Sequence, residues 1–139
     1  QPMEIRVMQL QEFLGQVQHQ ARMSSLDEAL SATRATLETL SERLQGGEPE
    51  NLGAQLPGEF KLMLNSHRDQ TETFSSDDFL QRISEREGVD LPVSVFHTRA
   101  VLNVLQDAVT PGAIEHVRDQ LPADYQRLFE AGSEGKMSH

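Results

Sequence analysis

Apolar residues return at helical intervals in two long segments of the chain. Between residues 26 and 44 a leucine or threonine recurs every three or four positions, and residues 91 to 109 repeat this spacing. The first series is Leu26, Leu30, Thr33, Leu37, Leu40 and Leu44, and the second is Leu91, Val95, Thr98, Leu102, Leu105 and Val109. Such steps place side chains on one face of an α-helix. Each segment predicts a long helix with one apolar seam and a threonine in its middle.

Helix-start signals precede both long segments. Ser25 followed by Glu28 matches a capping box, in which the serine oxygen accepts a backbone N–H and the glutamate reaches back. Asp90 takes the same place before the second segment, and Pro92 follows in the first turn, where proline is tolerated. The stretch LPVSVF, residues 91–96, could form a strand, but its match to LDEALS in the first segment favours a helix.

The two long patterns belong to an internal repeat. Gln55-Leu56-Pro57 returns 65 residues later as Gln120-Leu121-Pro122, and Thr33-Arg34-Ala35 returns at the same separation as Thr98-Arg99-Ala100. Phe13-Leu14 matches Phe79-Leu80 at a separation of 66, which implies one inserted residue. Several matched features in one order predict two copies of one unit.

We therefore expect an all-α protein of two tandem, similar helical units of about four helices each, related by a pseudo-twofold axis. The units would span residues 8–64 and 74–131, with a polar linker at 65–73 and a flexible tail at 132–139. A unit of this size would be marginally stable alone. The two seams should therefore dock on each other, which makes residues 1–139 a single compact domain.

The repeated Gln-Leu-Pro predicts a joint between helices. Proline suits the first helical position, so the third helix should end near Gln55 and the fourth should begin at Pro57. Leu56 cannot cap a helix, so we expect Gln55 to bond free backbone groups while Leu56 fills the core beside Phe60. In the second copy these roles fall to Gln120, Leu121, Pro122 and Tyr125.

The repeated arginines allow two interpretations. Arg34 and Arg99 could form two symmetric anion sites, or they could hold the carbonyl end of a neighbouring helix or a carboxylate. We favour the structural interpretation, because structural ion pairs are common and no other signal nearby indicates a ligand. The repeated residues to which we assign a structural role are Thr33, Arg34, Gln55, Leu56, Pro57, Thr98, Arg99, Gln120, Leu121 and Pro122.

Charge and composition narrow the function classes. The chain has 12 basic and 22 acidic residues, a net charge of −10, and no cysteine. Nucleic-acid affinity rests on cations that neutralise phosphates, so a nucleic-acid partner is disfavoured. The lack of cysteine excludes disulfides and thiol chemistry. No apolar stretch approaches the roughly 20 residues of a membrane-spanning helix. We expect a soluble cytoplasmic protein without a membrane partner.

Catalytic and metal-binding motifs are absent from the sequence. It has no nucleophile elbow, phosphate-binding loop, dinucleotide fingerprint or HExxH. None of the five histidines recurs between the units. His116 and Asp119 lie three residues apart on one helix, but two ligands do not define a metal site. We predict no catalytic, cofactor-binding or metal residue and no cofactor, and we favour a non-enzymatic function over an enzyme.

The repeat also carries a family resemblance. The stretches FLGQV, ATRATLETLSERLQGGE and LGAQLPGEF, followed by FLQRI, HTRAVLNVLQDAVTPG and VRDQLPADYQRLF, resemble a bacterial family of uncharacterised proteins, domain of unknown function family 2267. The resemblance covers about residues 10–130. It implies an all-helical, duplicated protein of the bacterial cytoplasm, and it implies no activity, substrate or catalytic residue.

Two hypotheses lead for the function. The first is a non-enzymatic interaction or regulatory module that grips an unknown protein partner with the surface between the units. The alternative is a small-ligand-binding protein or enzyme with a pocket between the two repeats, which convergence of Arg34, Arg99 and carboxylates on a cavity would support. The oligomeric state stays open, including a homo-oligomer.

Overall fold

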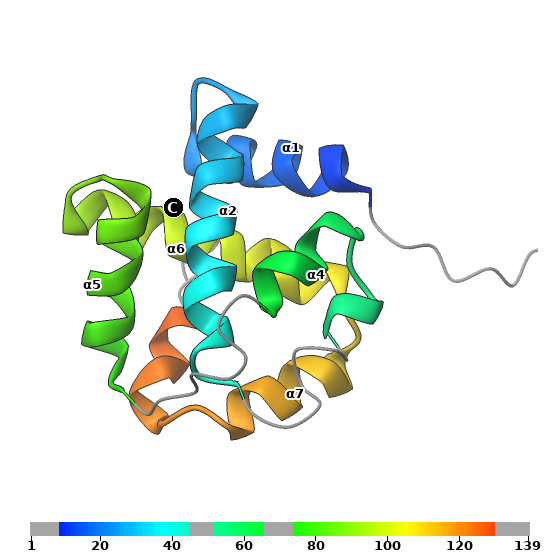
Figure 1. Cartoon of the computed structure of the whole chain (residues 1–139), viewed down its shortest axis with the longest axis vertical. Helices are drawn as coiled ribbons and strands as arrows, with labels where there is room; N and C mark the ends of the chain where they lie inside the picture. The colour runs from blue at the N-terminus through cyan, green and yellow to red at the C-terminus, as the bar shows by residue number, and fades with distance from the viewer. Residues whose placement is uncertain (1–8, 45–51, 66–73, 130–139) are drawn as a thin grey trace, which may run out of the picture.

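The computed structural model describes residues 9–44, 52–65 and 74–129, and across these ranges the chain is helical without any β-strand (Figure 1). The elements are α1 (Leu10–Ala21), α2 (Leu26–Ser41), α4 (Glu59–Leu64), α5 (Ser76–Glu87), α6 (Leu91–Ala108), α7 (Pro111–Asp119) and the 3₁₀ turn η2 (Ala123–Tyr125). Residues 52–54 and 126–129 are also helical. The all-α prediction is confirmed, and the stretch LPVSVF lies inside α6.

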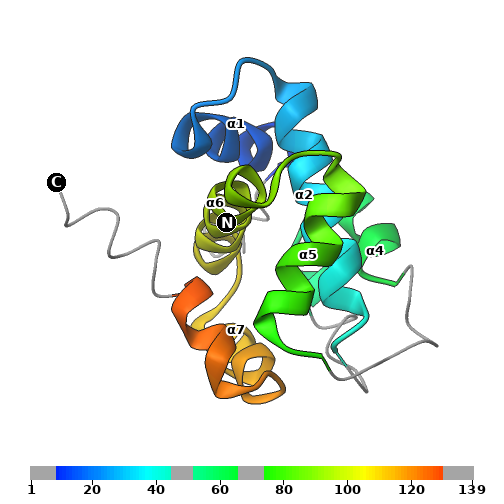
Figure 2. The same ribbon diagram turned by 90° about the vertical axis from the view of Figure 1, so that its left-hand side faces the viewer.

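The long helices α2 and α6 form the centre of the molecule. Helix α2 packs against α1, α4, α5 and α6, and α6 packs against α1 and α5 as well as α2. Figure 1 shows α2 between α5 on one side and α4 on the other, with α6 passing behind it. Figure 2 shows α1 above α6, and α7 below it. The seams of the two long helices therefore do meet.

The seam is buried over most of its length, but not at its start. Leu37, Leu40 and their counterparts on α6 are inaccessible to solvent. Leu26 and Leu91, however, are each 43% exposed. The predicted seam is therefore wrong in its first turn, where the leucine of each long helix remains partly open to solvent.

Both threonines in the seam are fully buried. Thr33 and Thr98 have no exposed surface, and neither hydroxyl has a hydrogen-bond partner among the described residues; the same is true of Thr36. A helical threonine usually donates to a carbonyl one turn earlier, as Thr39 does to Ala35 at 2.7 Å. Helices α2 and α6 therefore bury hydroxyl groups that have no hydrogen-bond partner in the described parts of the chain.

The two long helices begin with different N-terminal capping arrangements. The Ser25 hydroxyl accepts the backbone N–H of Glu28 at 3.2 Å, and the Glu28 carboxylate accepts the backbone N–H of Ser24 at 2.8 Å. Asp90 does stand at the N-cap of α6, but its side chain makes no capping hydrogen bond. The expectation that Asp90 satisfies the backbone as Ser25 does was therefore wrong. Proline in the first turn reduces the need, because Pro92 carries no N–H.

Helix boundaries follow the separations of the sequence repeat. Helix α5 begins 66 residues after α1, and α6 begins 65 residues after α2. Aromatic pairs occur at matching places: Phe13 and Phe60 meet edge to face with ring centroids 4.8 Å apart, and Phe79 and Tyr125 meet at 5.2 Å. The division into units 8–64 and 74–131 and their pseudo-twofold stay predictions. The tail at 132–139 and most of the linker lie outside the described residues.

Candidate functional site

The Gln-Leu-Pro segments do lie at helix-to-helix joints, with one correction. Helix α4 begins at Glu59, two residues later than expected, and the Pro57 carbonyl accepts the N–H of Phe60 at 2.9 Å. Pro122 likewise precedes η2 in an extended conformation, and its carbonyl accepts the N–H of Tyr125 at 3.0 Å. Each proline thus lies just before a helical segment, and its carbonyl accepts the backbone N–H of the residue three positions later, which forms the first turn.

Gln55 makes a longer-range bond than the joint hypothesis assumed. Its side-chain Oε1 accepts the backbone N–H of Thr110 at 2.7 Å, at the N-cap of α7. The bond therefore crosses between the two halves of the chain. Leu56 and Leu121 both lie in the core. Gln120 is the C-cap residue that follows α7, and its backbone N–H donates to the Val117 carbonyl at 3.1 Å.

Arg34 and Arg99 are both exposed on the outer faces of their helices. Neither guanidinium forms a hydrogen bond or an ion pair with a described residue. The contacts that our structural interpretation expected, with helix carbonyls or with a carboxylate, are therefore missing from the described parts of the chain. Arg34 lines the cleft described next and Arg99 is not among its lining residues, so this cleft does not bring the two arginines together.

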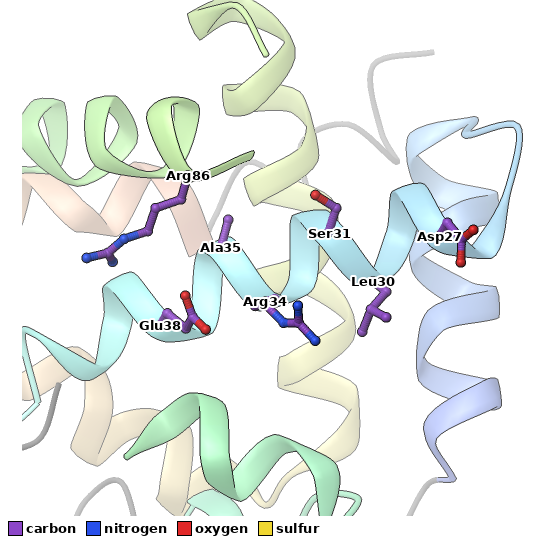
Figure 3. A pocket seen from close by; sticks show the side chains of 7 residues that line it. All are labelled: Asp27, Leu30, Ser31, Arg34, Ala35, Glu38 and Arg86. Atoms are coloured by element: carbon purple, nitrogen blue, oxygen red, sulfur yellow. The ribbon is translucent and has the colours of Figure 1, made fainter. Parts of the chain in front are cut away.

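This cleft lies between α2 and the end of α5, has a volume of about 350 Å³ and is open to solvent (Figure 3). We call it the α2/α5 cleft. Its lining residues are Asp27, Leu30, Ser31, Arg34, Ala35, Glu38 and Arg86. All but the last are on α2, at spacings of three, four and seven that keep them on one side of the helix. The repeat alone did not signal this cleft, because Arg86 has no arginine counterpart in the first half.

An ionic network fixes one wall of the α2/α5 cleft. The Glu42 carboxylate bonds Arg82 at 3.0 Å and Arg86 at 2.9 Å, and Arg86 also donates to the Thr39 hydroxyl at 2.8 Å. Burial alone would raise the pKa of Glu42, but the hydrogen bonds and charges of Arg86 and Arg82 outweigh it and hold that pKa below its usual value. Arg86 is therefore held in place, whereas Arg34 forms no hydrogen bond or ion pair with any described residue.

The end of α2 is also anchored to the start of the second half. The Arg82 guanidinium lies over the Phe74 ring, 3.9 Å from the ring centroid. The backbone carbonyl of Phe74 accepts the Arg43 Nε–H at 3.3 Å. The Tyr125 hydroxyl donates to the same carbonyl at 2.8 Å. Burial raises the pKa of Tyr125 to about 12. This phenol therefore stays protonated and structural at physiological pH.

A buried pair that the sequence did not single out joins α5 to α6. The Glu87 carboxylate bonds His97 Nδ1, and their side chains are only 3% and 13% exposed. The second oxygen of Glu87, Oε1, is buried without a partner among the described residues. Burial raises the pKa of Glu87 despite the opposing effect of His97. The only trace of this pair in the sequence is a difference between the repeats, because Ala21 and Ala32 occupy the matching positions of the first half.

Within the described ranges, no group of three or more histidines, aspartates or glutamates is arranged to hold a metal ion, and His116 and Asp119 are both exposed. None of the helices described here is both long and apolar enough to span a bilayer.

The fold and the cleft together define a small all-helical protein with a charged surface cleft between α2 and the end of α5. Comparison with protein families makes this more specific: residues 10–128 match the model of a family described as an uncharacterized conserved protein (DUF2267). The chain belongs to this family. No curated protein matches it.

Proposed function

We propose that the protein is a non-enzymatic interaction or regulatory module that binds a protein partner through the α2/α5 cleft. The observation that carries this proposal is Arg34, an exposed guanidinium in the cleft without a partner among the described residues. Arginine is enriched among the residues that dominate binding energy at protein interfaces, where its planar fork pairs with carboxylates.

The support around Arg34 favours binding over catalysis. The neighbouring wall is held by the bonds of Arg86 to Glu42 and Thr39, so that a partner would meet a preformed surface. No histidine lines the cleft, and neither of its carboxylates, Asp27 and Glu38, is fully buried. A pair of acid–base groups in contrasting environments, which hydrolytic and proton-transfer enzymes use, is therefore lacking in this cleft.

A small-ligand-binding role is the second candidate, and cleft size favours it. The volume of about 350 Å³ falls at the lower end of the range of ligand pockets, roughly 300–1,000 Å³. Arg34 and Arg86 both contribute guanidinium groups that could hold an anionic ligand. We propose a bacterial, cytoplasmic setting for either role, on the strength of the family resemblance and the absence of cysteine.

Quantitative affinity capture from cells tests the proposal. Wild-type protein, Arg34→Ala and Arg99→Ala would be immobilised, and retained proteins would be quantified by mass spectrometry. Arg99 is the matched control, because like Arg34 it is exposed and has no partner among the described residues, but it does not line the α2/α5 cleft. We expect Arg34→Ala to lose a partner that wild type and Arg99→Ala retain. Equal retention by all three proteins would contradict the proposal, and loss of a small molecule alone would favour the second candidate.

A further inference from the structure

We infer that the α2/α5 cleft recognises a partner segment in which one acidic side chain lies between two basic ones. This inference rests on the proposed function and names the chemistry of the partner. Its basis is the order of charges along α2, where Asp27, Arg34 and Glu38 present negative, positive and negative groups to the same cleft. Figure 3 shows Asp27 and Glu38 towards the two ends of the row, with Arg34 between them.

Helix geometry fixes the spacing of this charge row. Seven residues separate Asp27 from Arg34 and four separate Arg34 from Glu38, which correspond to about 10 Å and about 6 Å along the helix axis. Seven and four are both helical repeats, so the three charges stay on one face. Ser31 lies between the first two and adds a hydroxyl donor and acceptor. A partner helix lying along α2 could match all three charges at the same residue spacings.

The three charges are available because α2 does not neutralise them internally. Arg34 and Glu38 stand at i and i+4, where oppositely charged side chains often pair, yet no ion pair joins them. Their order explains this, because an acid on the N-terminal side of a base is the favourable orientation and here the order is reversed. Asp27 likewise has no ion pair with a described residue. A partner would therefore pair with these groups without first breaking bonds within α2.

The alternation of charges also excludes the wrong partner. A segment of the opposite order, acidic–basic–acidic, would place like charges opposite all three groups, which costs binding energy and slows association. The net charge of −10 acts in the same direction, since it repels segments that are acidic overall. Leu30, which is half-buried, supplies apolar surface beside the charges, against which the aliphatic part of a lysine or arginine side chain can pack.

Synthetic helical peptides test the inference directly. One peptide carries a central glutamate with lysines seven residues away on one side and four on the other. A second has the reversed order, to allow either helix direction, and control peptides carry the inverted charges. Binding would be followed at low salt by amide NMR shifts of the ¹⁵N-labelled protein. We expect one lysine–glutamate–lysine peptide to bind at least about tenfold more tightly than its inverted control, and to shift the amides of α2 residues 27–38.

Variants assign the effect to the cleft. Arg34→Glu should abolish the preference for the lysine–glutamate–lysine peptide, whereas Arg99→Glu should retain it. Equal binding of normal and inverted peptides, no binding of either, or shifts confined to other helices would overturn the inference. If that happens while Arg34→Ala still loses its captured partner, the interaction function stands and only the charge pattern is wrong. If capture is also unchanged, both fail.

Discussion

Two helix contacts at matching places in the repeat are held together in different ways. Helix α1 packs on α6, and α5 packs on α2. In the α1/α6 contact, the Asn103 amide donates to the Gln20 side-chain oxygen at 2.7 Å, a neutral bond. The positions that the repeat aligns with these two residues are Glu38 and Arg86, which line the α2/α5 cleft and do not bond to each other. A neutral hydrogen bond thus joins α1 to α6, whereas the matching positions of α5 and α2 line an open, charged cleft.

The contrast extends one turn further along the helices. Glu42 bonds Arg82 and Arg86 across the α2/α5 contact. The residues aligned with these three are Asp107, Gln16 and Gln20, and Asp107 is exposed. Helix packing at this place therefore does not require charges, since amides suffice on the α1/α6 side. Buried ion pairs add little net stability over neutral packing. Packing alone therefore does not call for the charges of the α2/α5 side, which agrees with the interaction role that we propose for this cleft.

The largest effect should come from separating the halves. The contacts of α1 with α6, of α2 with α5 and of α2 with α6 all join residues before 65 to residues after 73. Residues 74–139 expressed alone would leave the apolar faces of α5 and α6 uncovered. We expect no cooperative thermal transition for this fragment by circular dichroism, and its recovery on mixing with the first half. A monomeric, cooperatively folded fragment would refute the shared core.

Removing a buried leucine at a joint should cause the second largest loss of stability. Leu56→Ala and Leu121→Ala each remove a buried side chain and should lower the free energy of unfolding by about 2–5 kcal/mol. Urea titration measures this loss. Leu62→Ala is the control, because this α4 side chain is 81% exposed, and its effect should stay within about 0.5 kcal/mol. An unchanged midpoint for Leu121→Ala would show that its joint does not pack the core.

The ionic network should be more sensitive to mutation than the aligned positions of the α1/α6 contact. Glu42→Ala removes the carboxylate that Arg82 and Arg86 share, and we expect unfolding to cost about 2 kcal/mol less, a figure discounted because both arginines are partly exposed. The aligned variant Asp107→Ala should change stability by less than about 0.5 kcal/mol. Equal effects in urea titration would mean that the two contacts do not differ as described.

The neutral contact should show a smaller loss. Asn103→Ala removes one amide hydrogen bond to Gln20 and should cost about 1 kcal/mol. A double-mutant cycle with Gln20→Ala separates this bond from the effects of burial. A coupling energy of zero would show that packing alone maintains the α1/α6 contact.

The smallest difference concerns acid pH. The pKa of Glu42 is lowered from 4.5, so its stabilising contribution is present above about pH 4.5 and is lost as pH falls through the lower folded-state pKa. Glu42→Gln should therefore lose less stability than wild type on acidification.

Glu87 should show the opposite dependence on pH. Its pKa is raised in the folded protein, so its contribution to stability is fully present below about pH 4.5 and is lost as pH rises through the folded-state pKa. Glu87→Gln should accordingly remove a loss of stability on the neutral side. Chemical unfolding at a series of pH values measures both slopes, and parallel slopes for Glu42→Gln and wild type would contradict the assignment.

The sequence by itself determined the helices, most of their starts and the core. Periods of three and four residues, the Ser25 cap and the prolines near helix starts act within one turn, so a linear reading detects them. The matched aromatic and Gln-Leu-Pro positions located the joints to within two residues. Exposure of Leu26 and Leu91 was missed, because periodicity shows which face is apolar but not where the covering neighbour ends.

Only the tertiary structure decided which side chains meet. Glu42 bonds arginines 40 and 44 residues away, and Gln55 bonds a backbone N–H 55 residues away. The sequence predicted that Arg34 and Arg99 act alike, yet Arg34 lines the α2/α5 cleft and Arg99 does not. Such differences arise from the neighbour that each helix packs against, and a repeat of side chains along the chain does not specify that neighbour. The candidate site is a property of the α2/α5 contact, which packing creates.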